Sequence, residues 1–173
     1  IYLVRSLDGG STWLTPTLVF DAAAAGWDSV DKPHVVLDEQ ANVLHATWLQ
    51  STLPGSTSAR AIYYARSTDQ GETWSAPLKI AEGDVDWPQL SLVAANEPYL
   101  TWTQTAAQAT GTSPIQYSVW GQYSSDGGKQ WSPADAIPGF GQVSGPAALH
   151  GDGTGNLYLA AVGESTGGES TLI

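Results

Sequence analysis

Short runs of β-branched and aromatic residues, separated by turn-forming residues, make up most of this chain. Six of these runs have the length and composition of strands: Ile1–Arg5, Thr17–Phe20, Ala61–Arg66, Leu78–Ala81, Gln116–Tyr123 and Asp135–Ile137. No stretch sustains the 3.6-residue hydrophobic period of an amphipathic helix. The pattern therefore predicts an all-β protein.

Three prolines, Pro33, Pro88 and Pro146, each precede a further pair of apolar runs. The pairs are His34–Leu37 with Val43–Leu49, Gln89–Val93 with Pro98–Thr103, and Ala147–Leu149 with Leu157–Val162. Residues that favour turns lie between the two runs of each pair, as in Asp38–Asn42 and Gly151–Asn156. Each pair is therefore expected to form a β-hairpin.

An octapeptide of the form Ser-x-Asp-x-Gly-x-Thr-Trp recurs at Ser6–Trp13, Ser67–Trp74 and Ser124–Trp131, the last with Gln130 in place of threonine. Its tryptophans follow one another at nearly the same interval as the three prolines do. Two independent markers with one period indicate that a structural unit of roughly 60 residues repeats.

The residue types of the octapeptide suit a closed turn with one anchored end. Its aspartate can accept backbone N–H groups within the turn, its glycine suits a positive φ, and its hydroxyls can satisfy further amides. Its tryptophan is expected to bury its ring between strands. The residues given these structural roles are Ser6, Asp8, Gly10, Thr12, Trp13, Ser67, Asp69, Gly71, Thr73, Trp74, Ser124, Asp126, Gly128 and Trp131.

Four short strands in a repeat of this size match one blade of a β-propeller. With strands A to D named from the axis outward, the sequence predicts strands C and D of a first blade in residues 1–20. Two four-stranded antiparallel blades follow in 32–81 and 87–137, and strands A and B of a last blade in 146–173. This is about three blades' worth of strands, fewer than a closed ring contains. We therefore expect an incomplete propeller, part of a larger ring.

Two ways of completing that ring are open. The chain begins within a predicted strand and contains no methionine, which favours a segment of a longer polypeptide whose remaining blades close the ring. Alternatively, two copies form a homodimer in which strands A and B of one chain complete the blade opened by strands C and D of the other.

The octapeptide resembles the Asp-box, the bacterial neuraminidase repeat found in sialidases and in many β-propellers that are not sialidases. The resemblance covers most of the chain and implies the propeller fold, with the chain as part of a six-bladed ring in the manner of sialidases. It leaves two functions open: an exo-α-sialidase-type glycoside hydrolase, in which the full-length protein cleaves terminal sialic acid, and a non-catalytic extracellular propeller that binds glycans or proteins. The implied partner in the first case is a glycan or glycoconjugate.

Propellers bind ligands over the axis, on the face built from the D–A and B–C loops. There the predicted D–A loops bring acids and aromatic rings together, with Trp27, Asp28, Asp84 and Trp87 as candidate ligand-binding residues. Asp31 and Asp86 occupy equivalent places before Pro33 and Pro88 and are expected to meet near the axis. Paired carboxylates suit glycoside hydrolysis, one protonating the leaving oxygen while the other stabilises or attacks. Each acid equally suits a structural role as the cap of its loop.

The arginines limit the catalytic interpretation. The resemblance implies three arginines on the substrate carboxylate, a Tyr–Glu nucleophile pair and an aspartic acid/base, but the chain holds only Arg5, Arg60 and Arg66 and lacks the Arg-Ile-Pro motif. Arg60, in a B–C loop, is the candidate ligand-binding arginine. Arg5 and Arg66 precede octapeptides and are expected to pair with acids.

The composition of the chain excludes several classes of partner, metal site and membrane protein. Six basic against 17 acidic residues give a net charge of −11, which argues against a nucleic-acid partner. Without cysteine there is no thiol nucleophile or Cys-ligated metal, and no apolar run approaches the roughly 20 residues of a membrane span. The histidines lack metal spacing, and Gly151–Asn156 lacks the glutamate of an EF-hand. We expect no metal or cofactor, with calcium unsupported by a motif, and a secreted or cell-surface location.

Overall fold

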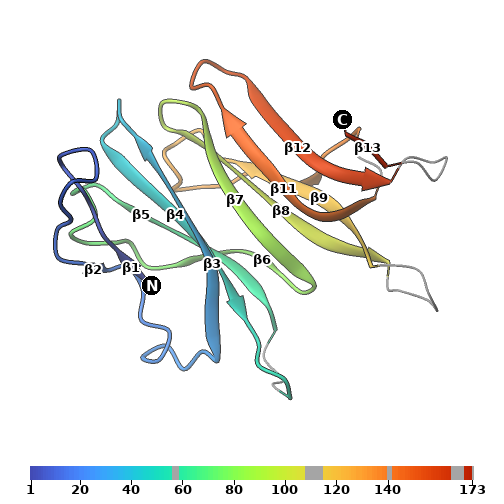
Figure 1. The fold of residues 1–173 in the computed structure, drawn as a ribbon, viewed down its shortest axis with the longest axis horizontal. Coiled ribbons are helices and arrows are strands. Elements are labelled where there is room, and N and C mark those ends of the chain that lie inside the picture. The colour runs from blue at the N-terminus through green and yellow to red at the C-terminus, as the bar shows by residue number, and fades with distance from the viewer. Residues whose placement is uncertain (56–58, 108–114, 140–141, 165–169, 173) are drawn as a thin grey trace.

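The computed structural model describes residues 1–55, 59–107, 115–139, 142–164 and 170–172, and its regular elements in these ranges are all β-strands (Figure 1). The strands are β1 (Tyr2–Leu3), β2 (Thr17–Leu18), β3 (Ser29–Asp38), β4 (Val43–Ser51), β5 (Ala61–Ser67), β6 (Leu78–Glu82) and β7 (Val85–Ala94). They continue with β8 (Glu97–Ala107), β9 (Gln116–Tyr123), β10 (Asp135–Ala136), β11 (Val143–Gly151), β12 (Leu157–Glu164) and β13 (Ser170–Leu172).

Consecutive strands pair antiparallel and build four-stranded blades. One blade has the order β3-β4-β5-β6 and the next β7-β8-β9-β10. β1 pairs with β2 before them, and β11 pairs with β12 after them. The innermost strand β7 contacts both β3 and β11, so successive blades stand side by side around a common centre. The fold is an incomplete, all-β propeller.

The innermost strands begin earlier than the sequence predicts. Predicted to start after Pro33 and Pro88, they start at Ser29 and Val85, so that Asp31 and Asp86 lie in strands rather than in D–A loops. The register shifts just before each proline, where Lys32 and Trp87 have φ of 51° and 46°. A β-bulge accommodates a proline that an uninterrupted ladder would reject, because its missing N–H falls where pairing is already broken.

The last blade has three strands in the described residues rather than the two predicted. Ser170–Leu172 forms β13 and pairs with Val162–Glu164 of β12. The sequence pattern does not predict this strand, because three residues are too few to show a period of two.

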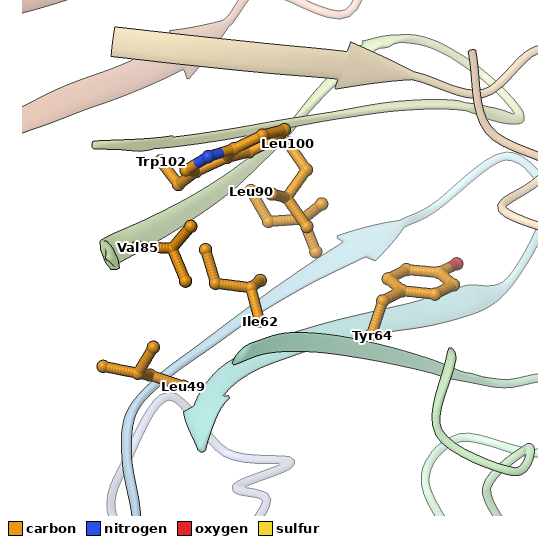
Figure 2. Close-up of a cluster of buried hydrophobic side chains, with 7 residues drawn as sticks. All are labelled: Leu49, Ile62, Tyr64, Val85, Leu90, Leu100 and Trp102. Atoms are coloured by element: carbon orange, nitrogen blue, oxygen red, sulfur yellow. The ribbon is translucent and has the colours of Figure 1, made fainter. Parts of the chain in front are cut away.

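The core lies between the blades. Figure 2 shows Leu49, Ile62 and Tyr64 of β4 and β5 facing four side chains of β7 and β8, which are Val85, Leu90, Leu100 and Trp102. A second cluster, around Trp48, fills the space between β1–β2 and the first complete blade, and a third, around Val143, joins β9 to β11–β12. Alternate residues of each strand thus face the two neighbouring blades.

The octapeptides form the closed turns that their residue types predict. In the second, Asp69 Oδ1 accepts the backbone N–H of Thr73 at 2.9 Å and the Ser67 hydroxyl at 2.7 Å, and Thr73 Oγ1 donates to Asp69 Oδ2. The first and third copies repeat the aspartate–backbone bond at 2.8 and 2.9 Å. The glycines Gly10, Gly71 and Gly128 have φ of 91°, 87° and 80°. Gln130 has no hydroxyl to make the last bond of the network.

Two of the three tryptophans anchor their turns as expected. Trp74 packs on the cluster around Trp48, and Trp131 packs on the one that contains Tyr64. In both cases the ring lies toward the preceding blade. Trp13 is 62% exposed, contrary to the expectation, because no described strands form a blade on that side of β1–β2.

The Asp69 carboxylate is expected to make the stability of the folded protein depend on pH in the acid range. Bonds from the Thr73 hydroxyl and backbone and from Ser67 lower the pKa of Asp69 from 3.8 to about 2. A group whose pKa is depressed by folding stabilises the protein above its unfolded pKa and loses that effect as pH falls through the folded value. We therefore expect Asp69→Asn to lower the denaturation midpoint at pH 7 and to equal the wild type near pH 2. Urea melts across this pH range test it, with Asp84→Asn, an exposed carboxylate outside these turns, as control; a pH-independent difference would contradict it.

Candidate functional site

One charged cluster, centred on Asp86, lies at the end of the blades opposite the octapeptide turns. Asp86 comes near the start of β7. The Lys32 ammonium, from β3 of the preceding blade, forms an ion pair with its Oδ1, and Arg60, just before β5, donates from Nη2 to its Oδ2 at 2.8 Å. Three segments far apart in sequence therefore meet at one carboxylate.

Asp86 is held in its ionised form. Burial alone would raise the pKa of this carboxyl group, but the bond from Lys32, the backbone N–H of Trp87 at 2.7 Å and the Arg60 guanidinium outweigh burial and lower the pKa below its usual value. At neutral pH the group has no proton to transfer. This state does not suit an acid that protonates a leaving group.

Two aromatic rings border the cluster. The Lys32 Nζ lies 5.1 Å from the centroid of the Trp87 ring, within the range of a cation–π contact. Trp87 in turn meets Tyr117 edge to face, with ring centroids 5.1 Å apart. Trp87 and Tyr117 are both half-buried, so the cluster combines fixed charges with partly accessible rings.

The cluster carries a local excess of positive charge on a chain whose net charge is −11. Two cations face one carboxylate, and the side chains of Lys32 and Arg60 keep 33% and 35% exposure. Among the described residues, the buried Arg60 Nε has no hydrogen-bond acceptor. The Nε atom is itself closed to solvent, so it is the partly exposed ends of the two cationic side chains that an anionic ligand could reach.

The structure gives the other predicted site residues different surroundings or a different degree of exposure. Trp27 packs between Phe20 and Tyr63, with ring centroids 4.4 Å away in each case, and belongs to the core. Asp28 and Asp84 are exposed. Asp31 is also exposed and enters no ion pair among the described residues. Lys32, the residue that follows Asp31 in β3, is the one that contacts Asp86.

Sequence reasoning missed Lys32 and Tyr117. Lys32 follows Asp31 just as Trp87 follows Asp86. These equivalent positions in successive blades hold a cation and an aromatic ring, and that pairing could have predicted the cation–π contact between them. Tyr117 opens a predicted strand, and nothing in the sequence distinguishes it from other strand aromatics. On the opposite face, Arg5 pairs with Glu72 at 2.6 Å as expected, whereas Arg66 forms no ion pair within the described ranges.

Comparison with known proteins identifies the fold to which this geometry belongs. The chain is 30% identical to a sialidase of Bacteroides fragilis (strain YCH46), over a 154-residue alignment that covers 75% of this chain and 28% of the relative. The solved Hadza microbial sialidase Hz136 superposes with a TM-score of 0.65 at 18% identity, over 92% of this chain and 35% of that one. The fold is sialidase-like.

A second group of solved structures agrees. A variant of the NanB sialidase from Streptococcus pneumoniae superposes with a TM-score of 0.59 at 14% identity, over 98% of this chain and 27% of that one. No family model matches the sequence. The chain thus spans between about a quarter and a third of the length of these sialidases. In the part that the structure describes, no helix is long and apolar enough to cross a membrane.

Proposed function

We propose that this chain is a glycan-directed part of a sialidase-like Asp-box propeller and that it binds the acidic group of a sugar at Lys32 and Arg60. The observation that carries the proposal is the convergence of these two cations on Asp86, with the side chains of Lys32 and Arg60 33% and 35% exposed. A guanidinium binds a carboxylate through parallel N–H bonds. The Trp87 and Tyr117 rings beside it supply the apolar surface that a sugar ring covers.

Binding fits these residues better than hydrolysis does. Asp86 is ionised and forms ion pairs with Lys32 and Arg60. Asp31, the other acid proposed for catalysis, is not the residue of β3 that contacts it. The arginine triad and Tyr–Glu pair implied by the Asp-box resemblance are not assembled around this cluster in the described part of the chain. The segment therefore contributes recognition, and its acidity and lack of cysteine favour a secreted or cell-surface protein.

We expect the chain to bind 3′-sialyllactose and to bind lactose at least about tenfold more weakly, because lactose lacks the carboxylate. Loss of a charge-assisted hydrogen bond, roughly 1.5–3 kcal/mol, corresponds to about a tenfold or larger change in Kd. Arg60→Ala should weaken binding of the sialoside by that factor and leave lactose unchanged. Isothermal titration calorimetry measures both.

Arg5→Ala is the matched control, since Arg5 pairs with Glu72 on the opposite face. Arg60→Lys keeps the positive charge but loses the two parallel N–H donors of the guanidinium. Its affinity for the sialoside should therefore lie between those of the wild type and Arg60→Ala. Thermal melts of each variant establish that the fold is retained. Equal affinity for the two sugars, or sialoside binding unchanged in Arg60→Ala, would overturn the proposed site.

Hydrolysis of terminal sialic acid by the whole protein is the second candidate function. The relatives named sialidases, of which this chain spans only part, favour it. An assay of the full-length protein with a fluorogenic sialoside tests it directly. Activity there, together with binding but no turnover by this chain alone, would assign catalysis to the remaining blades.

A further inference from the structure

The three charges of the Asp86 cluster do not cancel. Asp86 carries one negative charge, and Lys32 and Arg60 each carry a positive charge, so the three side chains together keep one positive charge. The other ion pairs of the described residues join one cation to one carboxylate, as in Arg5 with Glu72. Among the described residues, a carboxylate shared by two cations is therefore particular to this cluster.

Asp86 is held in place between its two cations. Its Oδ1 accepts from the Lys32 ammonium and from the backbone N–H of Trp87 at 2.7 Å, and its Oδ2 accepts from Arg60 at 2.8 Å. The side chain of Asp86 is 16% exposed, less than half the exposure of either cation. An anion that approaches the exposed parts of the two cations therefore also approaches a fixed negative charge.

The charge that the cluster keeps matches a ligand group with one negative charge. Such a group neutralises the cluster. A second negative charge on the same group meets no further cation, because in the part of the chain that the structure describes no third cation pairs with Asp86. That second charge is repelled by the Asp86 carboxylate, and its removal from water is not compensated by an ion pair.

Acidic neighbours along the chain act in the same direction. Asp31 directly precedes Lys32, and Asp84 directly follows Gly83, whose backbone N–H donates to the carbonyl oxygen of Arg60 at 2.9 Å. Asp31 and Asp84 are both exposed. The whole chain carries a net charge of −11. A doubly charged ligand is therefore repelled more strongly than a singly charged one on its approach as well as at the site.

We propose that Asp86 is a specificity-determining residue that limits the ligands of this site to sugars whose acidic group carries a single negative charge. Sugar carboxylates and sulfate monoesters belong to this class. Phosphate monoesters, which carry nearly two negative charges at neutral pH, are rejected. The inference rests on the proposed function, because it concerns the ligand held by Lys32 and Arg60. Asp86 here acts by repelling the wrong ligand rather than by attracting the right one.

Galactose 3-sulfate and galactose 3-phosphate test this inference, because their acidic groups are alike in shape and differ in charge. At pH 7.5 we expect the 173-residue chain to bind the sulfate at least about fivefold more tightly than the phosphate in isothermal titration calorimetry. At pH 5 the phosphate, with a second pKa of about 6, carries mainly one charge, and the two Kd values should agree within about twofold. Asp86 stays ionised there, because its ion pairs and the Trp87 N–H lower its pKa.

The sulfate carries one charge at both pH values, so its Kd reports any effect of pH on the protein itself. A phosphate affinity at pH 7.5 equal to or above that of the sulfate would overturn the inference, and so would the absence of sulfate binding. This comparison needs no variant and therefore does not depend on whether a substituted chain folds.

Asp86→Asn tests the residue itself. The substitution leaves two cations without their carboxylate, so the preference at pH 7.5 should reverse and favour the phosphate by at least about fivefold. If Asp86 served only to position Lys32 and Arg60, both ligands would weaken by the same factor, and that result would contradict the assignment. Glu72→Gln is the matched control, because it removes the same charge from the ion pair with Arg5 on the opposite face and should leave the preference unchanged. Far-ultraviolet circular dichroism verifies the folding of both variants.

Failure of this inference can be told apart from failure of the proposed function. If 3′-sialyllactose binding requires Arg60 but galactose 3-phosphate binds as tightly as the sulfate, the site stands and the charge selection by Asp86 is wrong. If 3′-sialyllactose binds no better than lactose, the site itself is wrong, and the inference falls with it.

Discussion

Replacing Gly128 by alanine is expected to destabilise this protein by about 3 kcal/mol or more, an exceptional loss for one added methyl group. A Cβ at this position would lie 1.8 Å from the hydroxyl oxygen of Tyr64 and 2.5 Å from its Cζ. The Tyr64 ring cannot withdraw, because it is 1% exposed and its hydroxyl lies 2.7 Å from Nδ1 of the buried His45. The φ of 80° adds backbone strain.

The other octapeptide glycines are matched controls, because the same substitution falls at the same turn position. Gly10→Ala meets no atom within 4 Å and should cost only about 1 kcal/mol of backbone strain. Gly71→Ala meets a Leu3 methyl group, which can rotate away, and should lie between the two. Urea denaturation of the three variants measures the order. Equal losses would show that backbone strain, rather than packing between blades, governs this position.

Trp131→Ala is expected to cost about 3 kcal/mol, the lower end for an aromatic truncation because the ring is only half-buried. Trp131 packs edge to face on Tyr64, with ring centroids 4.9 Å apart, and closes the core between two blades. Trp13→Ala removes the equivalent ring from an exposed position and should change the unfolding free energy by less than about 1 kcal/mol.

Thermal and urea melts of these two variants test whether the tryptophan acts through the blade beside it. If Trp131→Ala and Trp13→Ala lower the free energy of unfolding by comparable amounts, the ring stabilises its own turn instead. A related comparison ranks the ring against the carboxylate: Trp74→Ala should lower stability more than Asp69→Ala, because Trp74 packs in the core whereas Asp69 is exposed. The opposite order in urea would contradict that ranking.

Much of this fold could be predicted from the sequence because it depends on residues that are neighbours along the chain. The Asp69 turn is closed by residues that are close neighbours along the chain, from Ser67 to Thr73, so its sequence alone specifies its hydrogen bonds. The hairpin between β3 and β4 likewise follows from apolar runs on either side of turn residues. Bulges were harder to predict, because whether a chain bends before Pro33 or starts a strand there depends on the strand that pairs with it.

The functional cluster lies beyond such local reasoning. Lys32 and Asp86 are 54 residues apart, and Arg60 is 26 residues from Asp86. Their approach depends on how far each blade turns relative to the last, which no short-range pattern encodes. Radial symmetry predicted that Asp31 and Asp86 would meet, whereas the residue of β3 that contacts Asp86 is Lys32, a lysine rather than a second carboxylate.

The sequence by itself determined the strand content, the repeating unit and the closed octapeptide turns, since each depends on side chains that are neighbours along the chain. Only the tertiary structure decided which charges meet at Asp86 and which tryptophans pack against a neighbouring blade. Those outcomes arise from contacts between blades, where a residue's burial is set by a strand that lies a whole repeat away along the chain.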